Sequence, residues 1–199
     1  AHMGIVLLTS KDHVVFERAE VMTQAGTPYS VFTPYRAASL KKLDAFYLSS
    51  YPVERHAAAL APRPEGERRP LPTLADIGFA ATNLRALKIP LGARGGQQLF
   101  EDFFERIDHY HVARDFPAVK GPSYLSVHLR FGTVSIRQLA SMAHRLSLQG
   151  LQGATVWLSE LVWRDFYMQI LAHFPHVVET SFKPGYDAIR WEHGKHAES

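Results

Sequence analysis

The chain contains no cysteine, no long apolar run and no strong excess of charge of either sign. Without cysteine there can be no disulfide, no thiolate nucleophile and no cysteine-based zinc site, which fits a reducing compartment. No apolar run approaches the roughly 20 residues that a membrane-spanning helix needs, and no signal-peptide pattern opens the chain. We therefore expect a cytoplasmic protein that does not associate with membranes.

The net charge of +3 is spread too evenly to predict a nucleic-acid partner. Residues 1–96 hold 12 Lys and Arg against 8 Asp and Glu, whereas residues 97–199 hold 10 against 11. Nucleic-acid-binding domains usually carry a basic face or tail. A DNA-binding function must therefore be argued from other features. The length and the 46% hydrophobic content do allow one large domain with a sizeable core.

The first half of the chain divides into three parts. Residues 1–3, Ala-His-Met, resemble an expression scar and are set aside. Residues 4–60 mix short β-like pieces, IVLLTS and HVVFERAEV, with the helical pattern VFTPYRAASLKKLDAFYL. Residues 61–96 form a linker, because APRPEGERRPLP holds four prolines and five charged residues and the glycine-rich LGARGGQQ continues the irregular connection.

Residues 97–199 form a half that is predicted to be all α. QQLFEDFFERIDHYHVARDF predicts one amphipathic helix of about five turns. SVHLRFG predicts a short helix capped by Ser126 and stopped by Gly132, and Ser135 caps the helix IRQLASMAHRLSL. The longest predicted helix, ATVWLSELVWRDFYMQILAHF, ends before Pro175, and the polar residues after it are loop-like. The predicted fold class is therefore mainly α.

The stretch WLSELVWRDFY sets charges inside an apolar run. On a helix, Trp157, Glu160, Trp163/Arg164 and Tyr167 fall on one stripe. The interpretation that the residues alone favour is an internal ion pair between Glu160 and Arg164 at i, i+4. The alternative is a cavity wall, with indoles to stack a planar ligand, a carboxylate to accept its N–H groups and a guanidinium to hold a phosphate.

A family resemblance favours the cavity wall. ELVWRDFY after VWL resembles the flavin-binding helix of the DNA photolyase/cryptochrome family. The upstream block RDFPAVKGPSYLSVHLRFGTVSIRQ is similar to a block of that family in order and spacing. VFTPYRAASLKKL resembles the segment that ends the family's α/β antenna domain. Together the three blocks extend over about 170 residues and most resemble a microbial class I cyclobutane pyrimidine dimer photolyase.

The resemblance implies a domain organisation and a set of site residues. Residues 4–60 correspond to the C-terminal remnant of the α/β antenna domain, 61–96 to the interdomain linker and 97–199 to the N-terminal half of the FAD-binding helical domain. Glu160 and Trp163 match the catalytic positions that receive the flipped-out dimer, Trp163 by stacking and Glu160 by hydrogen-bonding the base edge. The implied FAD-binding residues are Tyr110, Ser123, Leu125, Ser126, Trp157 and Arg164. The implied DNA-binding residues are Arg114, Glu160, Trp163 and Arg164.

The implied chemistry is light-driven repair of DNA that contains pyrimidine dimers. Excited reduced FAD donates an electron to the cyclobutane dimer, the ring splits and the electron returns, while the protein supplies positioning and polarity. The 123–126 stretch departs from the family in one place, since Pro122 stands where the family has threonine and offers neither an N–H nor a hydroxyl. The resemblance does not identify an antenna chromophore.

The chain stops before the family block that completes the flavin pocket. We therefore expect a fragment that cannot repair DNA alone and that binds FAD weakly or not at all. Its exposed half-pocket is expected to favour homo-oligomers. By the same resemblance the parent protein is bacterial and lies at the nucleoid when it is bound to DNA.

Other functions have less support from the sequence. His109-x-His111 and His193-x-x-His196 lack an acidic partner pattern such as HExxH, so no metal site is predicted. Ser123 lacks the GxSxG elbow of many hydrolases. Two alternatives stay open, namely a cryptochrome-like blue-light photoreceptor and an inactive, self-associating fragment.

Overall fold

A computed structural model gives the structure of the chain and describes residues 4, 6–8, 10–51, 53–62, 64, 66, 70–195 and 197. Over these residues the protein is helical and contains no strand, which confirms the mainly α prediction. The expression-scar prediction for residues 1–3 lies outside them. The elements are α1 Phe32–Lys42, α2 Ala45–Leu48, η1 Val53–Ala59, η3 Leu84–Leu87, α3 Gly92–Phe104, η4 Ile107–His109, α4 Tyr110–Ala113, α5 Ser126–Arg130, α6 Ile136–Leu148, α7 Gln152–His173, η5 Pro175–Val178 and η6 Pro184–Ala188.

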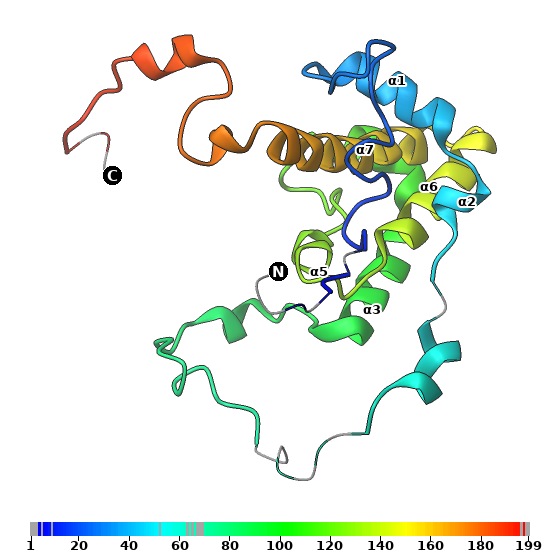
Figure 1. Ribbon diagram of the computed structural model, residues 1–199, viewed down its shortest axis with the longest axis vertical. Helices are drawn as coiled ribbons and strands as arrows, with labels where there is room; N and C mark the ends of the chain where they lie inside the picture. The colour runs from blue at the N-terminus through cyan, green and yellow to red at the C-terminus, as the bar shows by residue number, and fades with distance from the viewer. Residues whose placement is uncertain are drawn as a thin grey trace.

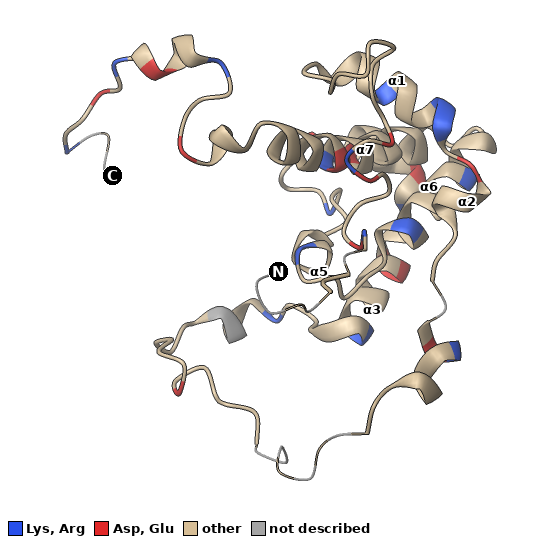
Figure 2. Cartoon of the chain, in the orientation of Figure 1, with Lys and Arg blue, Asp and Glu red and all other residues tan. Residues whose placement is uncertain are grey.

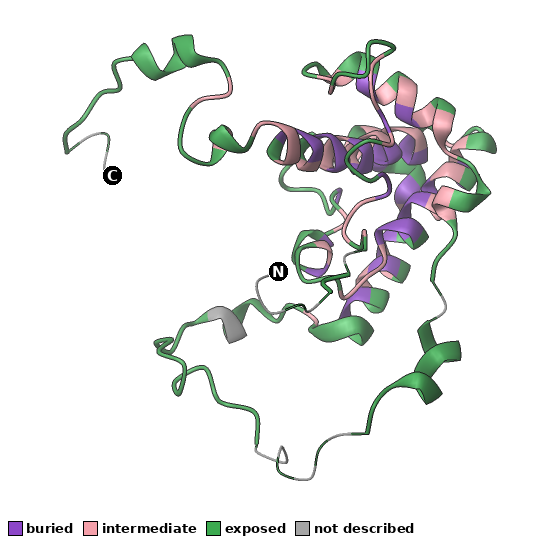
Figure 3. Ribbon diagram, viewed as in Figure 1, coloured by how far each residue is buried: buried purple, intermediate pink, exposed green. Residues whose placement is uncertain are grey.

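Helix α7 is the centre of the fold. It crosses the middle of the molecule and contacts α6, α4, η4 and α1 (Figure 1). Purple, buried residues run along most of its length (Figure 3), including Trp157, Leu158, Leu161, Val162 and Phe166. A helix that is apolar around most of its circumference is stable only when other elements cover it. Its predicted span, residues 154–174, agrees with the observed one to within about two residues at either end.

Residues 10–31 cross α7 without forming a strand. The amides of Val15 and Phe16 donate to the carboxylate of Asp165 on α7, at 3.0 Å to Oδ1 and 3.3 Å to Oδ2. The Tyr35 hydroxyl donates to the same carboxylate at 3.2 Å. Because these amides bond to a side chain, no neighbouring strand is needed to satisfy them. The β-like prediction for HVVFERAEV is therefore wrong, and so is that for the described part of IVLLTS.

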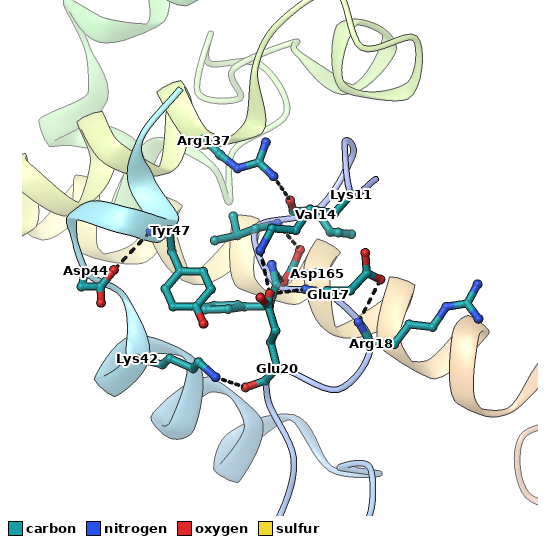
Figure 4. A network of polar contacts seen from close by, with 12 residues as sticks. Lys11, Val14, Glu17, Arg18, Glu20, Lys42, Asp44, Tyr47, Arg137 and Asp165 are labelled. Atoms are coloured by element: carbon teal, nitrogen blue, oxygen red, sulfur yellow. Dashed lines mark hydrogen bonds and ion pairs between the residues drawn. The ribbon is translucent and has the colours of Figure 1, made fainter. Parts of the chain in front are cut away.

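Figure 4 shows how the same segment is fastened to the helices around it. The ammonium of Lys11 pairs with the Glu20 carboxylate at 2.7 Å, and Lys42 of α1 donates to the Glu20 carbonyl oxygen. The Asp44 carboxylate accepts from the amides of Phe46 and Tyr47 and so caps α2. The predicted helix around residues 31–48 is thus divided into two helices, with a new cap at the break.

The prediction of one helix over residues 97–116 is wrong. The helix begins earlier than predicted, and the segment is divided into three shorter elements. Helix α3 begins at Gly92, inside the predicted linker, and ends at Phe104. A Cβ on Gly95 would lie 2.4 Å from the carbonyl carbon of Pro90, so glycine lets the linker fold back against the first turns of the helix. The chain then breaks into η4 and α4. The predicted apolar face survives the break, since Phe103, Ile107 and Tyr110 are buried.

Helices α5 and α6 follow their sequence signals more closely. The Ser135 hydroxyl accepts from the amide of Gln138, as expected of an N-cap, and the predicted face of α6 is buried (Ile136, Leu139, Ala143 and Leu146). Gly132 has φ +64° and stops α5. Ser126 is the first residue of α5 and makes no capping bond, so its predicted capping role is wrong.

Two described stretches lie away from the helices. Between α2 and α3 the chain makes a long excursion whose described residues are almost all exposed, and after η5 it extends away from α7 (Figures 1 and 3). The predicted linker, residues 61–96, falls within the first of these stretches, and its last residues belong to α3. Within the described residues, no helix is both long and apolar enough to span a membrane.

Candidate functional site

Three of the predicted site residues meet at the junction of α4 and α7. Arg114, directly after α4, donates from Nη1 to Oε1 of Glu160 at 2.6 Å. Its guanidinium also lies over the ring of Tyr110, 5.3 Å from the centroid. The hydrogen bond to Glu160 raises the pKa of Arg114, whereas burial is the main cause of the raised pKa of Tyr110. We call Tyr110, Arg114 and Glu160 the arginine–glutamate cluster.

The cluster is accessible to a ligand. The side chains of Arg114 and Glu160 are 32% and 35% exposed. An ion pair with that much exposure contributes little to stability, about 0–1 kcal/mol, because water competes for both charges. It does hold the carboxylate in one place, with its second oxygen free to accept a hydrogen bond.

Trp157 is part of the core. Its indole is 3% exposed and packs against Phe103, with ring centroids 4.8 Å apart, and against Phe100, at 6.4 Å. Phe103 in turn meets Tyr110 edge to face at 5.6 Å. Trp157 therefore supports the arginine–glutamate cluster from behind, through Phe103 and Tyr110.

Trp163 faces a different neighbour. Its indole stacks on Phe32 of α1, with centroids 3.5 Å apart and planes 10° from parallel, and Tyr167 stacks at 5.5 Å. Trp157 thus meets α3 while Trp163 meets α1, so the prediction of one continuous stripe is wrong. Successive residues of an α-helix are about 100° apart, and six positions place the two indoles about 120° from each other.

Arg164 does not pair with Glu160, so the ion pair that the residues alone favoured is not formed. Its guanidinium donates from Nη1 to the His13 carbonyl and from Nη2 to the Leu129 carbonyl at 3.3 Å. Burial lowers the pKa of Arg164. The side chain reaches the end of α5 and the N-terminal segment, away from the arginine–glutamate cluster.

The 123–126 turn carries two serine hydroxyls, Ser123 being half-buried and Ser126 exposed. The Ser123 hydroxyl accepts from the amide of Leu125 at 3.4 Å, Leu125 is fully buried and Ser126 is exposed. Tyr124 has φ +56°, a left-handed conformation that is costly for a tyrosine and that directs the turn outward.

Arg106 is a site residue that the sequence reasoning missed. Its guanidinium donates to the carbonyls of Lys120, Gly121 and Pro122 at 2.6–2.9 Å, and to Asp102 at 3.2 Å. It therefore fixes the loop that leads into Ser123. The i, i+4 spacing of Asp102 and Arg106 was a visible signal for the ion pair, but nothing in the sequence showed the three carbonyls.

The charged residues and the candidate metal ligands can be compared with what a DNA-binding face and a metal site would need. Lys and Arg are interspersed with Asp and Glu along the described part of the chain (Figure 2). Among the described residues, no three His, Asp or Glu side chains are grouped so as to hold a metal ion. His196 of the His193 pair lies outside the described residues.

The residues present fit part of a flavin dinucleotide. Hydroxyls at residues 123 and 126 and the guanidinium of Arg164 are suitable donors to phosphate oxygens. A cavity of about 230 Å³ near the start of α6 includes only Arg164 of the six residues assigned to FAD. Ligand sites usually enclose about 300–1,000 Å³, so these residues form a wall and not an enclosure.

Comparisons with known proteins identify relatives of this chain. The family described as the FAD binding domain of DNA photolyase matches residues 157–199, which begin at Trp157 on α7. A deoxyribodipyrimidine photo-lyase of Vibrio cholerae is 32% identical, and the match covers 96% of this chain and 39% of that protein. The photo-lyase of Escherichia coli is 29% identical, over 91% of this chain and 38% of that protein.

The solved structures give the same result for the fold. A bacterial class III photolyase from Agrobacterium tumefaciens superposes with a TM-score of 0.71 at 25% identity, over 94% of this chain and 39% of that one. The helices around α7 therefore define part of a photolyase-type FAD-binding domain. The chain is similar to DNA photolyases over almost its whole length, and it spans about two fifths of the length of the curated relatives that it matches.

Proposed function

We propose that this chain forms part of a deoxyribodipyrimidine photo-lyase, an enzyme that uses FAD and light to repair cyclobutane pyrimidine dimers in DNA. The observation that carries the proposal is the arginine–glutamate cluster. Tyr110 and Arg114, which the family resemblance selected from one part of the sequence, meet Glu160 from another part, and the half-exposed Arg114 and Glu160 lie 2.6 Å apart.

Glu160 would bind the edge of the damaged base. Its carboxylate is held by Arg114 and retains an oxygen that can accept an N–H group of the base. Arg114 would also meet a backbone phosphate of the DNA, for which a guanidinium is well suited. The pyrimidine dimer must leave the base stack to reach these groups, and a damaged pair is the least costly to unstack.

FAD, when bound, supplies the electron that splits the dimer, and the chain supplies positions and charges. Ser123, Ser126 and Arg164 would hold phosphate oxygens, and Leu125 would offer a backbone contact. Tyr110 would contact the cofactor, with Trp157 supporting it from the core. Pro122 removes one donor from this set.

Trp163 needs a rearrangement before it can stack on a damaged base. Its indole is already stacked on Phe32 at 3.5 Å and on Tyr167 at 5.5 Å. One of these rings must move for a base to take its place. Glu160 therefore has more support than Trp163 as the residue that recognises the dimer. The class I subgroup also remains a proposal, because the structural relative is a class III photolyase.

The activity can be tested in an exchange protein, in which residues 4–199 replace the matching segment of the Vibrio cholerae photo-lyase. We expect this protein to bind FAD and to repair a dimer-containing oligonucleotide under blue light but not in the dark. A protein that holds FAD and repairs nothing in light would contradict the proposal and would favour a cryptochrome-like photoreceptor.

The 199-residue chain by itself is expected to bind FAD weakly or not at all. Of the six residues assigned to FAD, only Arg164 lines a cavity of about 230 Å³, so that cavity does not gather the assigned residues into one enclosed site. Flavin fluorescence titrated with the purified chain measures the affinity. A purified chain that is yellow, with one FAD per chain and light-dependent repair, would show the expectation to be wrong.

A further inference from the structure

A cavity of about 230 Å³, lined by both polar and apolar side chains, lies where the N-terminal segment crosses the start of α6, and the carboxylate-bearing Asp12 is among its lining residues. Its wall includes His13 and Tyr51 from the first part of the chain, Thr133 and Ser135 from the turn before α6, and the two arginines Arg137 and Arg164. We call this the two-arginine cavity. It shares only Arg164 with the residues assigned above to FAD.

Arg137 is a buried cation with few partners. It is 4% exposed, and its guanidinium lies 4.4 Å from the centroid of the Tyr51 ring. Its one hydrogen bond within the described chain runs from Nη2 to the Val14 carbonyl at a long 3.4 Å (Figure 4). A guanidinium has five N–H donors, so most of its donor capacity is unused.

Neither arginine has a carboxylate partner in the described part of the chain. Arg164 bonds only to carbonyl oxygens, and burial lowers its pKa. Asp165, the nearest acid in sequence, is already occupied by the amides of Val15 and Phe16. The side chain of Asp12 is 85% exposed and contacts His13 at 3.6 Å. Arg164 is half-buried, and the charge of Asp165 partly offsets its own. Arg137 is buried and forms no ion pair with a carboxylate within the described residues. A buried cation without a counter-charge is costly, and an anion beside Arg137 reduces that cost.

Two hydroxyls complete the wall. Thr133 Oγ1 lies 2.7 Å from Nδ1 of His128, and Ser135 Oγ accepts from the Gln138 amide at 3.4 Å. Within the described part of the chain the Ser135 hydroxyl accepts this one bond and makes none as a donor, so its hydrogen can turn into the cavity. Paired guanidinium groups with hydroxyl donors match the geometry of a tetrahedral oxyanion.

We infer that the two-arginine cavity binds a phosphate group, either free phosphate or the end of a phosphomonoester. Arg137 supplies the charge at one side, Arg164 the charge at the other and Ser135 a hydrogen bond. The inferred site shares Arg164 with the proposed FAD contacts, whereas Arg137 and Ser135 have no part in the proposed FAD or dimer contacts, so variants at these two residues test the cavity separately from photolyase activity.

Isothermal titration of the 199-residue chain with inorganic phosphate tests the site, at constant ionic strength set with sodium chloride. We expect one phosphate per chain, and Arg137→Gln should raise the Kd about tenfold or more because a hydrogen-bonded charge is lost. A parallel titration with glycerol 3-phosphate distinguishes the two sources, and the tighter ligand indicates which one the cavity fits. If the heats measured with phosphate and with glycerol 3-phosphate both equal the heat of adding sodium chloride, the inference is overturned.

A second pair of variants tests the site even if Arg137→Gln fails to fold. Ser135→Asp keeps an N-cap acceptor for α6 but places a carboxylate in the cavity, where it pairs with the arginines and excludes phosphate. Ser135→Asn is the matched control with a cap and no charge. We expect binding to weaken about tenfold or more in Ser135→Asp and to stay within about twofold in Ser135→Asn. Equal phosphate affinity of the two variants would overturn the inference.

Discussion

Asp165 joins two parts of the chain that are 150 residues apart in sequence. Its carboxylate is almost fully buried and accepts from two backbone amides and from Tyr35. Burial raises the pKa of Asp165 from 3.8 to about 6, against the opposing effect of these hydrogen bonds. The sequence showed an acid inside an apolar helix but could not show its partners, because they lie far away along the chain.

Because the pKa of Asp165 is raised, the difference in stability between Asp165→Asn and the wild-type protein should depend on pH. The native state holds a proton on Asp165 more tightly than the unfolded state, so this group's contribution to stability falls as pH rises from about 4 to about 6. Asparagine has no such titration. The free energy of unfolding of Asp165→Asn minus that of wild type should therefore rise by about 2–3 kcal/mol from pH 4 to pH 7.

Urea denaturation of both proteins across this pH range measures the gain. Glu179→Gln is the control, since Glu179 is exposed and its replacement should give a difference that does not change with pH. A flat difference for Asp165→Asn as well would mean that Asp165 is ionised in the native state throughout the range.

At the scale of elements, the sequence predicted helices that carry their own start and stop signals. Helix α6 has its Ser135 cap and its 3–4 spaced face, and α7 ends before Pro175, so both could be placed. Helix α3 could not, because Gly92, Gly95 and Gly96 read as loop residues. Gly96 is in fact a site of close packing, where a Cβ would lie 2.5 Å from Val134 and 3.0 Å from His128.

The start of α7 depends on another close approach. A Cβ on Gly153 would lie 1.9 Å from the Ile107 carbonyl oxygen and 2.6 Å from that of Asp108. Both contacts are to backbone, which cannot move aside as a side chain can. Gly153→Ala should therefore lower the free energy of unfolding by about 1–3 kcal/mol or more, through forced separation of α7 from η4.

Gly185→Ala is the matched control for Gly153→Ala. A Cβ at Gly185 meets nothing within 4 Å, so the change should stay within about 0.5 kcal/mol of wild type. Thermal or urea unfolding of the two variants gives the comparison. If both variants unfold like wild type, then α7 does not sit on η4 as described.

At the scale of the site, the residues came from the family resemblance, and the structure shows which of them meet. Tyr110, Arg114 and Glu160 converge, whereas Trp163 and Arg164 reach other neighbours. Spacing along one helix set the angle between Trp157 and Trp163 but not what faces each of them. That depends on α1 and α3, whose placement follows from packing over the whole chain.

At the scale of the molecule, apolar side chains remain exposed beside the arginine–glutamate cluster. Val112, Phe116, Val119 and Tyr124 are 46–56% exposed. Such a patch favours self-association in water. We therefore expect the 199-residue chain to show a molar mass that rises with concentration in light-scattering chromatography.

Phe116→Ser should reduce that self-association by removing the largest apolar side chain after the tyrosine. Val178→Ser is the control, because Val178 is 71% exposed but lies in η5, after the end of α7. Equal association of the two variants, or a chain that is monomeric at every concentration, would contradict an interface at the cluster.

The most direct measurement of the central claim is lesion discrimination by Glu160. In the exchange protein, the affinity for a dimer-containing oligonucleotide is compared with that for the undamaged one by fluorescence anisotropy. Glu160→Ala should lower this ratio about tenfold or more, through loss of a charged hydrogen bond to the base, while Glu179→Ala leaves it unchanged. An unchanged ratio in a Glu160→Ala protein that still holds FAD would contradict the assignment of the arginine–glutamate cluster to the dimer.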